Sequence, residues 1–226
     1  MSSPDRVLID RRAFLGGLGL SVLAVPLTAD AQPAAKVPRI GFLNPSGPAP
    51  AAGFIAGADE PLWIKLRSEP YLVVFMRHTH STGGNPLTWD ETGNCRGEVV
   101  LSANGKAHAK KIGDAFVQHG VKPSRLISSP MCRCRETAQI AFGSNYVTDA
   151  ALREIASADA ERTAAYEKTA VSLIVKHLGN APVVFVSHRP NINLLTMELI
   201  AEGDLLIGRA DEKGEIDVVG KTRIEP

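Results

Sequence analysis

Tyr71-Leu-Val-Val-Phe-Met76 is a short, fully apolar stretch, and Arg77-His78-Thr79-His80-Ser81 follows it directly. An apolar run of this length that ends in polar residues predicts a strand buried on both faces of a sheet. In an open α/β sheet, ligands bind at the carboxyl ends of the strands. Arg77 and His78 stand at that end, where they offer a fixed positive charge and an imidazole nucleophile. We therefore expect a site for an anion to begin here.

Two later stretches repeat this arrangement. Pro182-Val-Val-Phe-Val-Ser187 runs into His188, and Leu126-Ile-Ser-Ser129 leads into a predicted helix that carries Arg133. Guanidinium groups match the oxygens of a phosphoryl group bidentately. Three strand ends that supply two histidines and two arginines therefore predict a site for a phosphoryl group.

Strands alternate with helices along residues 60–226, which predicts an α/β fold. We expect a three-layer α/β/α sandwich with a mostly parallel central sheet. Helices are predicted at residues 61–68, 102–119, 132–142, 159–178 and 191–201. Strands are predicted at residues 71–76, within 121–129 and at 182–187, with an extended segment at 147–154 and a terminal hairpin from 205–208 and 216–219.

Three motifs occur in a fixed order, each after a predicted strand: Arg77-His78-Thr79, Ser129-Pro130-x-x-Arg133-x-x-x-Thr137-Ala138 and Ser187-His188. In this order they resemble the signature segments of the histidine phosphatase superfamily, also called phosphoglycerate-mutase-like, over about residues 60–225. The resemblance implies a phosphoric monoester hydrolase of the histidine phosphatase fold. It also implies that His78 forms a phosphohistidine intermediate, and that Arg77, Arg133 and His188 bind the phosphoryl group, with His188 protonated against the bound anion.

The general acid is predicted from a fourth segment. Leu152-Arg153-Glu154 resembles the family's Leu-x-Glu segment, which implies that Glu154 is the general acid and later the base. Asp90 and Glu91, in the loop after the Arg-His motif, are the alternatives. A carboxyl group beside a phosphate site is expected to have a raised pKa, which suits a proton donor.

Two positions depart from the family pattern. Thr79 stands where many members have Gly, and Gly84 stands where many have a phosphate-binding Asn. Asn85 is adjacent to Gly84, and Ser81 or Thr82 can donate from the same loop. We assign Ser81 to the phosphate-binding set.

No cofactor or metal is predicted. His78-x-His80 has a spacing that metal sites use, but no carboxylate or third histidine completes a ligand set in sequence. Cys132-x-Cys134 lacks the second pair that a zinc site needs. We expect the other three histidines to be solvated on helices: His108, His119 and His177.

The chain has three cysteines, and this odd number leaves at least one thiol unpaired. The simplest interpretation is three small buried side chains near the site. A disulfide from Cys95 to Cys132 or to Cys134 is the alternative.

The N-terminal residues predict export. Arg11-Arg12-Ala-Phe-Leu opens an apolar run over residues 14–26, and Ala29-Asp30-Ala31 follows. This pattern resembles a twin-arginine signal, so residues 1–31 are interpreted as a signal peptide of a periplasmic enzyme. The run is shorter than the roughly 20 residues of a membrane span, which disfavours the alternative of an anchor. Residues 32–59 are rich in Ala, Pro and Gly and predict a linker, although residues 36–44 resemble the start of periplasmic solute-binding proteins.

The formal net charge of +1 argues against binding to nucleic acid or to anionic membranes. We expect a small phosphomonoester as the partner and no stable membrane association after signal cleavage. A phosphomutase and a non-catalytic phosphate-binding module are the competing functions. The second is disfavoured because a binder needs no nucleophile. The sequence indicates neither the leaving group of the substrate nor the oligomeric state.

Overall fold

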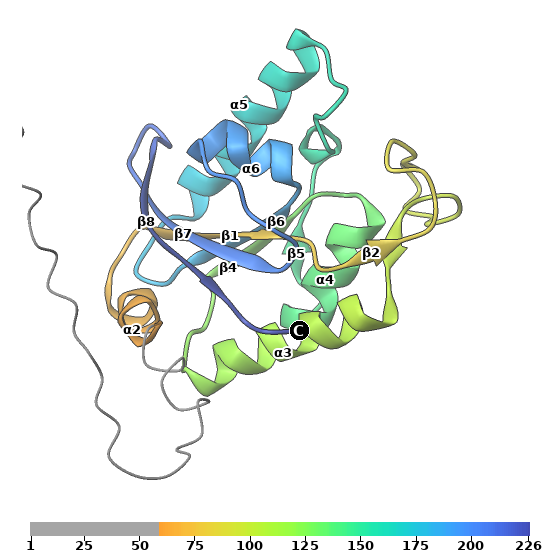
Figure 1. Cartoon of the computed structure of the whole chain (residues 1–226). Coiled ribbons are helices and arrows are strands. Elements are labelled where there is room, and N and C mark those ends of the chain that lie inside the picture. The colour runs from red at the N-terminus through yellow and green to blue at the C-terminus, as the bar shows by residue number, and fades with distance from the viewer. Residues whose placement is uncertain (1–58) are drawn as a thin grey trace, which may run out of the picture. The chain divides into compact units, whose positions relative to one another are not determined.

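The structure, a computed structural model, describes residues 59–226. The predicted signal peptide at residues 1–31 and, apart from Asp59, the predicted linker at residues 32–59 lie outside the described residues. Within them, a six-stranded sheet of order β5-β4-β6-β1-β7-β8 lies between two layers of helices (Figure 1). This confirms the predicted three-layer α/β/α sandwich.

The main sheet is mostly parallel. β6 pairs in parallel with β1 and β4, and β4 with β5, while β7 runs antiparallel to both β1 and β8. The strands are β1 Leu72–Arg77, β4 Arg125–Ser128, β5 Tyr146–Val147, β6 Val183–Ser187, β7 Asp204–Ala210 and β8 Ile216–Arg223. The last two strands form the predicted terminal hairpin.

Two layers of core lie on the two faces of this sheet because successive side chains of a strand point to opposite faces. In β1, Val74 and Met76 pack against α2, α3 and α4, whereas Val73 and Phe75 pack against α5 and α6 (Figure 1). The helices are α2 Glu60–Ser68, α3 Ala103–Gln118, α4 Cys132–Phe142, α5 Ala160–His177 and α6 Arg189–Thr196.

The parallel register brings three strand ends together. β6 lies between β1 and β4, with Arg77 opposite Ser187 and Ser128 opposite Val186. The residues that follow these strands therefore meet at one edge of the sheet, as expected for an α/β site.

Helix α4 begins at Cys132, as predicted, but its start is capped from a distant loop. Met131, its N-cap residue, makes no side-chain capping bond. The buried carboxylate of Glu98 instead accepts a hydrogen bond of 2.8 Å from the Cys132 amide. A carboxylate at this end of a helix is also favoured by the helix dipole.

Some predicted elements were wrong at their ends. The helix predicted to reach residue 201 ends at Thr196, because Met197 adopts a left-handed conformation with φ of 60°. The segment predicted as extended at residues 147–154 contains a 3-10 turn, Ala150–Leu152. The small sheet of β2 (Ser81–Thr82) and β3 (Val100–Leu101) was not predicted.

His108 was predicted to be solvated and is instead buried. Its Nε2 lies 2.6 Å from the carbonyl oxygen of Ile224 near the C-terminus. None of the helices in the described part of the chain is both long and apolar enough to span a membrane.

Gly105 in α3 offers a test of the contact between this helix and the Arg-His loop. An added Cβ would lie 2.0 Å from the carbonyl oxygen of His80, so we expect Gly105→Ala to lower the unfolding free energy by about 1–3 kcal/mol. Gly179→Ala is the matched control, since no atom lies within 4 Å of its added Cβ. Urea unfolding would measure both variants, and equal stability of the two would contradict the close approach.

Candidate active site

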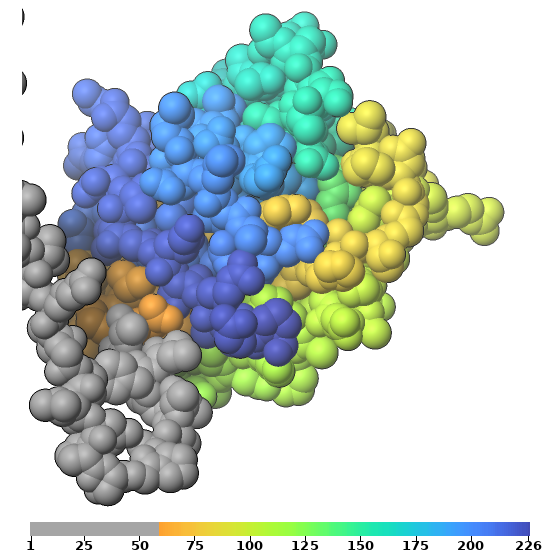
Figure 2. Space-filling model, viewed as in Figure 1, coloured from red at the N-terminus to blue at the C-terminus, as the bar shows by residue number. Residues whose placement is uncertain are grey.

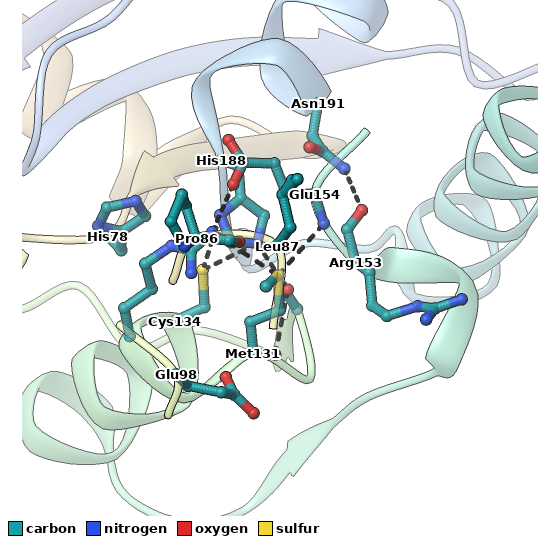
Figure 3. Close-up of polar contacts among 12 residues, drawn as sticks. His78, Pro86, Leu87, Glu98, Met131, Cys134, Arg153, Glu154, His188 and Asn191 are labelled. Carbon is teal, nitrogen blue, oxygen red and sulfur yellow. Dashed lines mark hydrogen bonds and ion pairs between the residues drawn. The ribbon is translucent and has the colours of Figure 1, made fainter. Parts of the chain in front are cut away.

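The two predicted catalytic histidines lie together at the edge where β1 and β6 end. The ring centroids of His78 and His188 are 5.6 Å apart, and both side chains are buried (Figure 3). The strands rather than direct contacts place them, because each follows its strand immediately.

The hydrogen bonding of His78 defines its tautomer. Nδ1 lies 2.9 Å from the carbonyl oxygen of Thr79, which can only accept a hydrogen bond. Nδ1 therefore carries the proton and donates it, which leaves Nε2 with a free lone pair. A neutral imidazole in this tautomer suits a nucleophile.

The burial of both histidines favours their neutral form. Burial lowers the pKa of His78 to about 3, opposed by its hydrogen bond to Thr79 and assisted by Arg133 and Arg77. Burial, followed by Arg133, His78 and Arg77, also lowers the pKa of His188 well below its ordinary value. His188 is thus neutral in this arrangement, and its protonation against a bound anion stays a prediction.

His188 contacts two side chains that precede it in the chain. Its Nε2 lies 2.8 Å from Oγ of Ser129 and 3.6 Å from Sγ of Cys134. Burial raises the pKa of the Cys134 thiol to about 12, so this cysteine is not a reactive thiolate. The contacts with Ser129 and Cys134 position the imidazole ring of His188.

Arg133 is the most buried arginine of the site, and the two terminal nitrogens of its guanidinium group have different surroundings. Its Nη2 contacts Oε2 of Glu154 at 2.5 Å and the carbonyl oxygen of Pro86 at 3.4 Å. Its Nη1 is buried without a hydrogen-bond partner among the described residues. A buried donor without a partner is costly, so it marks a place where an acceptor would bind.

Arg77 shows the same feature. Its Nη2 lies 3.5 Å from Oε1 of Glu202, whereas its Nε is buried without a partner among residues 59–226. The structure thus places guanidinium donors that have no partner in the described part of the chain beside the two neutral histidines.

Thr79, which departs from the family pattern, connects the Arg-His loop to two helices. Its amide donates to Oγ1 of Thr137 in α4, and its hydroxyl donates to the carbonyl oxygen of Gly105 in α3. Thr137 in turn donates to the carbonyl oxygen of Arg133. A glycine at position 79 would lack the bond to α3.

Among the three predicted acids, the structure brings Glu154 alone into contact with Arg133. Asp90 accepts hydrogen bonds from the hydroxyl and amide of Thr92. The hydroxyl bond is the main reason why the pKa of Asp90 is lowered, which disfavours a proton donor. Glu91 is exposed in the same loop.

Ser81 was predicted to bind phosphate. It lies in β2, paired with Leu101, and its side chain makes no hydrogen bond within residues 59–226. Gly84 stands where many family members have Asn, and the structure explains why no Asn is found there. Gly84 has φ of 55°, and an added Cβ would lie 2.1 Å from the carbonyl oxygen of Glu98. Asn85 uses its side chain to accept from the Leu87 amide.

A disulfide joins this loop to the start of α4. Cys95 is bonded to Cys132, whereas Cys134 is free and buried. The simplest interpretation of three separate thiols was therefore wrong, and the alternative with a disulfide holds. Arg135 in α4 is half-buried and donates twice to the carbonyl oxygen of Gly93 in the same loop, at 3.1 Å.

A pocket of about 190 Å³ adjoins Glu154. Its wall combines the loop after β2 with the segment after β5, which border each other at the surface (Figure 2). Sequence reasoning missed the side chains that meet here, among them Trp89, Arg153 and Arg162. No spacing links them, because Trp89 lies far from the other two in the chain.

The described part of the chain contains no cluster of three or more His, Cys, Asp or Glu residues arranged to hold a metal ion.

A family model described as the histidine phosphatase superfamily (branch 1) matches residues 73–172. Over these residues, which are less than half of the chain, the match agrees with the predicted superfamily. The matched histidine phosphatase segment includes His78, Arg133 and Glu154, whereas His188 follows it in the chain. No curated protein matches the sequence.

Solved structures of similar fold include three phosphatases. The protein histidine phosphatase SixA complexed with tungstate is 15% identical, with a TM-score of 0.48, and covers 67% of this chain and 96% of its own. A mycobacterial glucosyl-3-phosphoglycerate phosphatase is 16% identical, with a TM-score of 0.48 and coverages of 67% and 98%. A phosphoserine phosphatase from Entamoeba histolytica is 15% identical, with a TM-score of 0.46 and coverages of 68% and 98%.

The buried neutral histidines predict a loss of stability in acid. A histidine whose pKa is lower in the folded than in the unfolded protein binds its proton first in the unfolded state. Between about pH 6.5 and pH 3, the lowered pKa of His78 therefore reduces the unfolding free energy as the pH falls, by up to about 1.4 kcal/mol per pH unit, and the lowered pKa of His188 acts in the same direction.

Urea unfolding from pH 7.5 to 4.5 would compare wild type with His78→Asn. We expect a shallower pH dependence in the variant, because one proton uptake is lost. Equal slopes would show that His78 titrates alike in both states.

Proposed function

We propose that this domain hydrolyses a small phosphomonoester through a phosphohistidine intermediate on His78, without a metal. One observation carries the proposal: two neutral buried histidines lie beside two arginines that each keep a buried guanidinium N–H without a partner among the described residues. An anion with several oxygens would satisfy both donors. A nucleophile beside such a site suits transfer of the anion rather than binding alone.

In the first step, the lone pair of Nε2 of His78 attacks phosphorus. The phosphorus–oxygen bond to the leaving group breaks, and that oxygen takes the proton of Glu154. Arg77 and Arg133 compensate the charge of the phosphoryl oxygens, and His188 donates to them once protonated. The carbonyl oxygen of Thr79 accepts a hydrogen bond from the Nδ1 N–H of His78, so that the imidazole keeps its orientation during the attack.

In the second step, water attacks the phosphohistidine and gives its proton to the Glu154 carboxylate. The phosphorus–nitrogen bond breaks, and inorganic phosphate and neutral His78 are released. Support for Glu154 comes from Arg133, whose Nη2 holds the carboxyl while Nη1 remains for a phosphoryl oxygen. One guanidinium thus holds the acid beside the group it would protonate.

The roles are tested with 4-nitrophenyl phosphate and an alkyl phosphate in the presence of chelator. We expect His78→Ala to lower turnover by at least about a thousandfold and to abolish the acid-labile phosphoenzyme. His80→Gln is the control, because this exposed neighbour contacts Ser102 and lies outside the proposed set; we expect a change of less than about threefold.

In the same assay, Glu154→Gln should slow the alkyl phosphate at least about tenfold more than 4-nitrophenyl phosphate, whose leaving group needs no proton. Equal slowing of both substrates would contradict the acid assignment. A folded wild-type protein that binds phosphate without turnover would favour a binding module, and transfer of the phosphoryl group back to the product would favour a phosphomutase. Loss of activity in chelator would contradict metal independence.

We also propose export to the periplasm by the twin-arginine route. The paired Arg11-Arg12, the apolar run and Ala29-Asp30-Ala31 support it. The Cys95–Cys132 disulfide adds independent support, since structural disulfides persist in oxidising compartments and are rare in the cytosol.

The export proposal is tested by expression in a bacterium with a twin-arginine pathway. We expect the wild-type chain in the periplasmic fraction, shortened by about 31 residues and with the disulfide formed. Arg11→Lys with Arg12→Lys should leave the full-length chain in the cytoplasm with both thiols reduced, whereas Lys36→Arg, beyond the signal, should be exported like wild type. Equal export of the paired variant would exclude the twin-arginine route.

A further inference from the structure

We propose that the pocket beside Glu154, lined by Trp89, Arg153 and Arg162, binds a compact anionic group on the leaving-group side of the substrate, either a carboxylate or a second phosphate. This inference rests on the proposed phosphatase function and goes beyond it, because it states the class of substrate.

The position of the pocket relates it to the leaving group. Glu154 contacts Arg133 through its carboxylate and also lines the pocket. Pro86 and Met131, which contact Nη2 of Arg133, line the same pocket, so it adjoins both Arg133 and the acid. In Figure 3, the side chain of Arg153, which also lines it, points away from His78. A substrate whose phosphoryl group lies at Arg133 would therefore extend past Glu154 into this pocket.

The charge of the pocket favours an anion. Neither Arg153 nor Arg162 forms an ion pair with a carboxylate within residues 59–226. The one carboxylate that lines the pocket, that of Glu154, is paired with Arg133. Two guanidinium charges thus face a shared cavity without compensation from an acidic side chain.

Both guanidinium groups are held in place yet keep free donors. Arg162 donates from Nη2 to the carbonyl oxygen of Glu154 at 2.9 Å, and Arg153 donates from Nε to the carbonyl oxygen of Ala150 at 3.0 Å. The guanidinium of Arg153 also lies 4.3 Å from the ring centroid of Trp89. An arginine has five N–H donors, so most remain for a ligand while the contacts limit the entropy lost on binding.

The size of the pocket limits the ligand. A volume of about 190 Å³ slightly exceeds that of an engineered cavity of about 150 Å³ that accepts benzene. The pocket therefore accommodates one ring or a short carbon chain with a single charged group. Leu87 supplies apolar surface for the carbon skeleton, and Ser157 adds a hydroxyl.

The test compares hydrolysis of phenyl phosphate with that of three analogues substituted at the para position. These carry a carboxylate, a carboxamide of the same shape without charge, or a second phosphate. For wild type, we expect kcat/KM for at least one anionic analogue to exceed that for the carboxamide by about tenfold or more, which equals about 1.4 kcal/mol. The carboxylate and bisphosphate arms show which of the two anions is preferred.

The variants separate a specific pocket from general attraction by positive charge. Arg153→Gln and Arg162→Gln should each lower the ratio of anionic to carboxamide kcat/KM several-fold. Arg96→Gln is the matched control, because Arg96 is exposed in the same loop but does not line the pocket; it should leave the ratio unchanged.

The inference would be overturned if wild type hydrolysed phenyl phosphate but showed the same kcat/KM for the carboxylate and bisphosphate analogues as for the carboxamide. The phosphatase function would then still stand. An equal loss of the ratio in Arg96→Gln would also overturn it, because the preference would then come from net charge. No hydrolysis of any of the four compounds by the folded protein would overturn the function and the inference together.

Discussion

The site depends on the parallel pairing of β6 with β1 on one side and β4 on the other. All five residues of β6 are buried, so a register shift by one residue would exchange the side chains that are packed in the two core layers and would displace the end of the strand. The packed core on both faces therefore fixes where the strands end. This packing brings His78, His188 and Arg133 close together. His78 and His188 follow directly after β1 and β6, and Arg133 lies in the first turn of α4, the helix that follows β4.

Burial affects the charge of the histidines and of the arginines of the site differently. Burial lowers the pKa of both histidines, so that they are neutral. Arginine stays charged because its ordinary pKa is far above neutral pH. The same buried edge therefore offers an uncharged nucleophile and charged ligands. The guanidinium donors without partners among residues 59–226 cost free energy in the folded protein, as is common where a structure is arranged for a ligand.

Sequence reasoning was most successful where local pattern and strand ends decide the structure. The apolar runs predicted β1 and β6, and the bounds of α4 were predicted correctly. His108 was misplaced although a signal existed, because it stands four residues before the buried Ile112 and so on the same face of α3. The contact between Trp89 and Arg153 could not be predicted. It forms only because the loop after β2 folds back, and periodicity carries no information about such non-local contacts.

The path of that loop links the pocket to the phosphate-binding arginine. Cys132 is the first residue of α4 and forms the disulfide with Cys95. The Glu98 carboxylate accepts a hydrogen bond from the amide of Cys132 and so caps the N-terminus of α4. Arg133 follows immediately and contacts the carbonyl oxygen of Pro86. The disulfide, the cap and this contact therefore attach one pocket wall to the helix that carries Arg133. Because Arg133 in turn holds Glu154, whose carbonyl oxygen is bound by Arg162, the two walls of the pocket and the proposed acid are positioned by one connected set of contacts.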